Sequence, residues 1–121
     1  MSALQAELQA ASADFQKLQI DVSNVVEARQ KLEVQLSENE LVKKEFEHLT
    51  PENIVYKLIG PVLVTQDQGD AKANVETRLE FIRSEIKRVE GQLKELQSTQ
   101  ERKKQEIVEM QQAAAAPSPS P

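Results

Sequence analysis

The chain has 121 residues, of which 29% are charged, 3% are aromatic and three are glycine. These proportions are poor material for a compact globular core, so we expect at most one domain with an elongated, mainly helical fold. The net charge of −5 and the lack of a basic stripe argue against a nucleic-acid-binding protein. Because there is no cysteine, disulfides and thiolate metal sites are excluded.

The first part of the chain has the repeat of a coiled coil. Apolar residues recur there at spacings that alternate between four and three. We predict a helix over residues 2–49, because Ser2 and Gln5 stand in capping-box positions and Pro51 disfavours further helix. The residues at these positions form one stripe along the helix, which we call the first seam. They are Leu4, Leu8, Ala11, Phe15, Leu18, Val22, Val25, Arg29, Leu32, Leu36, Asn39, Lys43 and Phe46.

The segment from Ile54 to Gln66 is neither polar nor helically periodic. Val, Ile and Tyr dominate it, and Gly60-Pro61 separates two strand-length apolar pieces. We predict a β-hairpin over residues 54–66 with a type II′ turn, since Gly60 can take a positive φ while Pro61 fixes a negative one. The two-residue turn then sets the register, in which Ile59 faces Val62.

Both faces of the predicted hairpin are largely apolar, and only Lys57 is charged. An isolated hairpin is marginally stable in water, and its edges offer unpaired N–H and C=O groups. Because the chain has no other strand candidate, we expect partner strands from other chains, added by β-augmentation. Packing of the hairpin on its own helices is the less favoured alternative, since the helices have little spare apolar surface. The predicted subunit interface consists of Val55, Tyr56, Leu58, Ile59, Gly60, Pro61, Val62, Leu63 and Val64.

A second seam follows the hairpin without a break in phase. We predict a helix over residues 70–112 with Asp70 as its N-cap. Because the hairpin returns the chain on itself, the two helices should pair as an intramolecular antiparallel coiled coil, with Phe46 near Val75 and Phe15 near Ile107. The residues of the second seam are Val75, Leu79, Ile82, Ile86, Val89, Leu93, Leu96, Gln100, Lys103, Ile107 and Met110.

Polar side chains interrupt both seams. Such residues cost stability but fix register and partner choice, which is the role we predict for Arg29, Asn39 and Lys43. Gln100 and Lys103 lie nearer the free end, where they should loosen the helix pairing. The loosened part would expose a mobile apolar surface for part of the time. That surface comprises Leu4, Leu8, Ala11, Phe15, Ile107 and Met110.

Residues 113–121 read AAAAPSPSP, a composition that cannot build a core. We predict a disordered tail there and assign no site to it. The predicted organisation is therefore one coiled-coil domain with a hairpin over residues 1–112, followed by the tail.

No catalytic, cofactor or metal site is expected. His48, the sole histidine, lies near a helix end and has no set of partner residues that would form a catalytic site. The many Glu residues stand at helical charge-pair spacings from Lys and Arg, which favours helix-stabilising ion pairs over an acid/base pair. The N-terminus lacks the features of a signal peptide, and no run is long enough to span a bilayer. We therefore expect a soluble intracellular protein that is not an enzyme.

Three runs of sequence resemble the β-class subunits of prefoldin. They are RQKLEVQLSEN at Arg29–Asn39, YKLIGPVLVTQD at Tyr56–Asp67 and NVETRLEFIRSEI at Asn74–Ile86. The hairpin run is the specific one, because heptads alone fit many unrelated proteins. Lys72 stands where the family leads us to expect arginine, and the Pro/Ser tail matches no motif of the family.

The resemblance implies a subunit of a hetero-hexameric co-chaperone that needs no ATP and no cofactor. In it, α-class and β-class subunits join their hairpins into a β-barrel from which coiled coils project. The tips would hold unfolded clients such as actin and tubulin and pass them to the cytosolic group II chaperonin. The distal apolar surface defined above is then the predicted client-binding site, and the expected location is cytoplasmic, with a nuclear pool left open.

A structural coiled-coil adaptor or scaffold is the alternative function. It would form a parallel homodimer through the same heptads and would leave the hairpin unexplained. The distance between Leu4 and Met110 within one chain discriminates the two, because only an antiparallel intramolecular pair brings them together.

Overall fold

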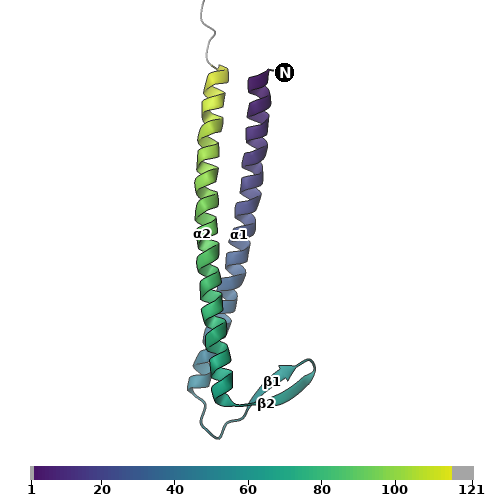
Figure 1. Ribbon diagram of the computed structural model, residues 1–121, viewed down its shortest axis with the longest axis vertical. Coiled ribbons are helices and arrows are strands. Elements are labelled where there is room, and N and C mark those ends of the chain that lie inside the picture. The colour runs from purple at the N-terminus through teal and green to yellow at the C-terminus, as the bar shows by residue number, and fades with distance from the viewer. Residues whose placement is uncertain (1, 116–121) are drawn as a thin grey trace, which may run out of the picture. The chain divides into compact units, whose positions relative to one another are not determined.

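The computed structural model describes residues 2–115 and consists of two long helices with a β-hairpin between them (Figure 1). The elements are α1 (Ala3–Glu47), β1 (Val55–Ile59), β2 (Val62–Gln66) and α2 (Gln68–Ala115). This confirms the predicted mainly helical fold. Within residues 2–115, no helix is both long enough and apolar enough to cross a membrane.

The chain divides into two compact units. Unit 1 is formed by Met1–Ala28 and Val89–Pro121, and unit 2 is Arg29–Arg88. The boundary crosses both helices, so each unit contains one segment of α1 and one segment of α2. Unit 2 also contains the hairpin.

The start of α1 is closed by the predicted capping box. The backbone N–H of Gln5 donates to Ser2 Oγ, and the N–H of Ser2 donates to Gln5 Oε1, both at 3.1 Å. At its other end the helix stops at Glu47, two residues before the predicted position. There the N–H of His48 donates to the carbonyl three residues back, at 3.2 Å, which tightens the last turn.

The start of α2 corrects the predicted cap. Asp67, not Asp70, is the N-cap, because Asp67 Oδ2 accepts the backbone N–H of Asp70 at 3.1 Å and its carbonyl accepts the N–H of Ala71 at 2.9 Å. The helix therefore begins at Gln68, two residues earlier than predicted. Gln68 in turn donates from Nε2 to the carbonyls of Thr50 and Asn53, at 2.8 and 2.7 Å, and so ties the loop before β1 to this helix start.

The end of α2 lies at Ala115, three residues beyond the predicted position. Residues 113–115 belong to the predicted disordered tail but are helical, because Ala has the highest helix propensity of all residues. The rest of the predicted tail, residues 116–121, lies outside the described part of the chain.

The hairpin has the predicted register. Its strands pair antiparallel, with Ile59 opposite Val62 and Leu58 opposite Leu63. Gly60 has a φ of 56°, in the left-handed region that a II′ turn requires at this position.

The helix seams follow the predicted heptad phase. All residues of both seams are buried or half-buried, whereas most residues between them are exposed. In unit 2 the core lies on the first part of α2, where Leu79 is completely buried and Ala71, Val75 and Ile82 are nearly so. In unit 1 the buried apolar residues are Ala11 and Val89.

Candidate subunit interface and client-binding surface

The apolar side chains of the hairpin are open to solvent on both faces. Leu58 and Leu63, cross-strand partners on one face, are 66% and 64% exposed, and Ile59 and Val62 on the other face are also exposed. The alternative in which the hairpin buries itself on its own helices is therefore wrong. Of the predicted interface residues only Val55 is half-buried. An exposed apolar surface of this kind is characteristic of an interaction site.

The hairpin also has an open edge along β1. The two-residue turn makes Ile59 and Val62 a hydrogen-bonded pair, and hydrogen-bonded and non-hydrogen-bonded pairs alternate along an antiparallel ladder. The backbone N–H and C=O groups of Leu58 and Tyr56 consequently point away from β2. They are the groups that an added strand would pair with.

A groove that the sequence did not predict lies beside this edge, within unit 2. Both helices and the hairpin contribute to it, so residues distant in the sequence meet there. We call it the β1 groove. It is lined by Val42, Phe46, Val55, Tyr56, Lys57, Leu58, Gln66, Ala71, Asn74, Val75 and Arg78.

Polar seam residues of unit 2 contact the opposite helix. Lys43 Nζ lies 2.7 Å from Glu76 Oε1. Asn39 Oδ1 accepts a hydrogen bond from Arg78 Nη1 at 3.4 Å, while Asn39 Nδ2 donates to a carbonyl of its own helix. These contacts agree with the register-fixing role predicted for Asn39 and Lys43. Arg29 forms an ion pair with Glu33 of the same helix, at 3.4 Å.

The predicted client-binding residues all belong to unit 1 and lie in its helix seam. Ala11 is only 5% exposed, and the others are half-buried. The structure thus brings them together as the contact between two helix segments. Binding a client through them requires this part of the seam to open. The half-buried members are Leu4, Leu8, Phe15, Ile107 and Met110.

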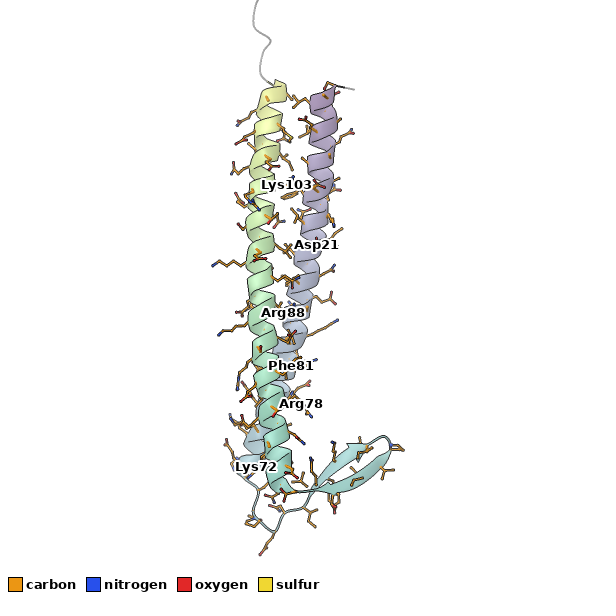
Figure 2. All side chains as sticks on the ribbon, viewed as in Figure 1. Asp21, Lys72, Arg78, Phe81, Arg88 and Lys103 are labelled. Atoms are coloured by element: carbon orange, nitrogen blue, oxygen red, sulfur yellow. The ribbon has the colours of Figure 1, made fainter. Side chains whose placement is uncertain are left out.

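Lys103 is held in the seam of unit 1 by carboxylates. Its Nζ lies 3.1 Å from Glu106 Oε2 and 3.7 Å from Asp14 Oδ2, the latter on the opposite helix. The hydrogen bond to Glu106 raises the pKa of Lys103 above its ordinary value. Figure 2 shows Lys103 on its segment of α2. The predicted interruption is therefore a charged seam position with partners on both helices.

Within residues 2–115, no group of three or more His, Asp or Glu side chains is arranged to hold a metal ion. His48 is exposed.

Two long helices with one solvent-exposed β-hairpin between them define a class of mainly helical protein in which a strand edge is left open. The chain matches the family described as "Prefoldin subunit" over residues 9–114 and therefore belongs to the prefoldin family, which is a family of chaperones. It is similar to proteins called prefoldin subunit 6. Identity to the Bos taurus protein is 45% over 109 residues, which cover 90% of this chain and 84% of the relative. The protein of Saccharomyces cerevisiae is 41% identical over 107 residues, 88% of this chain and 94% of the relative.

The fold is also that of a solved structure, the crystal structure of the prefoldin beta subunit from Thermococcus strain KS-1. The TM-score is 0.81, at 24% sequence identity, and the match covers 98% of this chain and 100% of that one. Prefoldins are not known as enzymes, and membership in the family implies assembly with other prefoldin subunits.

Proposed function

We propose that this chain is a subunit of the hetero-hexameric prefoldin co-chaperone, which captures unfolded or nascent proteins without ATP. Its clients would include actin and tubulin, which the hexamer passes to the cytosolic group II chaperonin. The observation that carries the proposal is the solvent-exposed apolar hairpin of a prefoldin-family chain. An isolated two-stranded hairpin is only marginally stable in water, so this hairpin would be stabilised by strands of other subunits.

Assembly would bury the hairpin in a β-barrel shared with neighbouring subunits. Each large apolar side chain that becomes buried contributes roughly 1.5–3 kcal/mol. Closing the strands into a barrel also removes the open edges. Leu58, Leu63, Ile59 and Val62 would each bury a large apolar surface in this way, since more than half of each residue is exposed.

Client capture would take place in unit 1, where the seam contains the predicted client-binding residues. Gln100 and Lys103 occupy seam positions there that would ordinarily be apolar, and Lys103 contacts Asp14 of the opposite helix segment instead of packing. The lost apolar packing lowers the free energy needed to separate the helix segments. Several subunits that each offer a weak apolar patch would bind one client with useful avidity. Weak single contacts also allow release.

The experiment is aggregation suppression with an assembled hexamer. In the test variant, Leu4, Leu8 and Phe15 are changed to Ser. In the matched control the exposed residues Gln9, Gln16 and Gln19 of the same helix are changed to Ser. We expect the test hexamer to lose most of its suppression of unfolded actin aggregation, while the control retains it. Equal suppression by both, at equal helicity in circular dichroism, would contradict client capture by this surface.

No observation favours the adaptor. Its parallel homodimer needs free seams, but the seam residues already pair inside one chain in each unit. Labels at Leu4 and Met110, both in unit 1, would report a short distance within one chain if the antiparallel pairing holds in solution.

We also propose that the chain works in the cytoplasm, where nascent clients and the chaperonin are found. Fluorescence imaging of the tagged chain would test this location and any nuclear pool.

A further inference from the structure

The β1 groove carries positive charge and no negative charge. Lys57 and Arg78 are the charged residues of its lining, and both are cations. Elsewhere in unit 2, Lys43 has the carboxylate of Glu76 as its partner and Arg83 that of Glu40, at 2.7 and 3.6 Å. Lys57 and Arg78 have no such carboxylate partner among residues 2–115.

Arg78 has only a neutral partner. Within residues 2–115, its one polar contact is the hydrogen bond to Asn39 Oδ1 at 3.4 Å, which is long for an N–H···O bond. Lys57 forms no ion pair with any described residue. A guanidinium carries five donors in a planar fork that suits a carboxylate, so most of the binding capacity of Arg78 is unused. Figure 2 shows Arg78 on α2, in the segment that belongs to unit 2.

The rest of the groove is built to accept an extended chain. On one side the backbone groups of Tyr56 and Leu58 are open to pairing. Apolar lining comes from buried Ala71 and Val75 and from half-buried Phe46. An added strand would therefore hydrogen-bond to β1 with its backbone and place alternate side chains toward the helices.

We propose that the β1 groove receives a strand of a neighbouring subunit that carries a carboxylate side chain, which pairs with Arg78 and Lys57. The inference rests on the proposed hexamer and adds the chemistry by which one neighbour is chosen. Arg78 and Lys57 are then specificity-determining residues of the assembly. A neighbour without the carboxylate would leave two cations partly desolvated and unpaired, which is costly.

A second copy of this chain does not fit the groove. The hairpin segment 54–66 contains no acidic residue, and its only charged side chain is the cation Lys57. Asp67, the first carboxylate after β2, already accepts the N–H of Asp70 as the cap of α2. Like charges on adjacent strands repel, so the groove selects against self-association and for a different subunit.

The experiment is a competition for places in the hexamer. Wild-type chain and a mass-distinguishable variant are mixed in equal amounts with a limiting supply of the other subunits, and native mass spectrometry counts which one is incorporated. The variants are Arg78→Glu and the milder Arg78→Gln. Lys87→Glu is the matched control, because it makes the same charge change as Arg78→Glu at an exposed position of α2 outside the groove. Circular dichroism checks that each variant is as helical as the wild type.

We expect Arg78→Glu to be incorporated about tenfold less than Lys87→Glu, with a smaller gap at high salt, and Arg78→Gln to fall between them. In the wild-type hexamer, zero-length carbodiimide coupling should join Lys57 to an Asp or Glu of one neighbouring subunit. Equal incorporation of Arg78→Glu and Lys87→Glu, or a hexamer in which Lys57 couples to no neighbour, would overturn the inference while leaving the hexamer itself intact. A wild-type chain that enters no hetero-hexamer would instead overturn the proposed function, and this inference with it.

Discussion

Lys43 on α1 and Glu76 on α2 form an ion pair across the helix seam of unit 2, with 2.7 Å between Nζ and Oε1. Lys43 occupies a seam position that would ordinarily be apolar. The residue numbers of the two partners add to nearly the same value as those of Asp14 and Lys103, the cross-helix pair of unit 1. The helix segments therefore run antiparallel in each unit.

Reversing one charge of the Lys43–Glu76 pair should lower the stability of the chain, and reversing both charges should restore most of it. We expect Lys43→Glu to destabilise it, because two carboxylates would then face each other, and the double variant with Glu76→Lys to recover most of the loss. Both side chains are nearly half exposed, at 43% and 45%, so the coupling energy should be about 0.5–1 kcal/mol. Thermal unfolding followed by circular dichroism measures it, and a double variant no more stable than Lys43→Glu would contradict the cross-helix contact.

Two glycines should respond oppositely to substitution by alanine. Apart from chain neighbours and, at Gly91, the backbone of its own helix, no atom lies within 4 Å of a Cβ added at Gly60 or Gly91, so the effects are conformational. Gly60→Ala should cost about 1–2 kcal/mol, because a φ of 56° is unfavourable for an L side chain. Gly91→Ala should stabilise by about 0.5–1 kcal/mol, since Gly91 lies inside α2. Thermal unfolding of the two variants tests this, and a Gly60→Ala variant as stable as the wild type would contradict the positive φ at the turn.

The hairpin should be needed for assembly and dispensable for the helices. Changing Leu58 and Leu63 to Asp places two charges on a surface that assembly buries, which is costly when they are unpaired. We expect loss of the hexamer in native mass spectrometry with unchanged helicity. Ile20→Asp is a control, because Ile20 is an equally exposed apolar residue of α1. Normal assembly of the Leu58 and Leu63 double variant would argue against a strand-mediated interface.

Closing the seam of unit 1 should weaken client capture. Lys103→Leu replaces a charged seam residue by the residue that this position of a coiled coil prefers. We expect a higher melting temperature and less suppression of client aggregation, because the helix segments would separate less often. Lys104→Leu is the matched control at an exposed position. If Lys103→Leu suppresses aggregation as well as the wild type despite its higher stability, seam opening is not part of capture.

Acid should remove a small contribution of Glu85 to stability. The hydrogen bond from Arg88 lowers the pKa of the Glu85 carboxyl below its ordinary value of 4.5. A lowered pKa in the folded state means that the contribution is fully present above pH 4.5 and is lost as the pH falls through the lowered value. The difference in melting temperature between wild type and Glu85→Gln should thus shrink below pH 4.5. In an Arg88→Gln background this pH dependence should vanish; its persistence there would assign it to another group.

The sequence predicts this fold well where one local rule decides the outcome. The heptad spacing places both seams correctly, because seam residues such as Leu79 and Ile82 can leave water only by packing against the other helix. The hairpin register follows from the Gly60-Pro61 turn alone. The exposure of the hairpin is likewise predictable, since the apolar stripes of the helices pack against each other and leave little apolar surface to cover the hairpin.

The sequence did not predict features that depend on two similar residues competing for one role or on several elements coming together in space. Asp67 and Asp70 are both good N-caps, and only the position where β2 ends decides for Asp67. The β1 groove needs residues from α1, β1, β2 and α2 at once, and no spacing in the sequence links Arg78 to Lys57. The heptad spacing places Ala11 on the seam, but how far Ala11 is buried depends on how closely two helix segments pack.

The most direct measurement is native mass spectrometry of this chain, purified through a tag from its own cells. We expect a hexamer in which the other components are small helical prefoldin subunits, because the exposed hairpin needs strands that this chain does not contain. A homodimer of this chain alone, or a stable monomer, would contradict assembly through the hairpin.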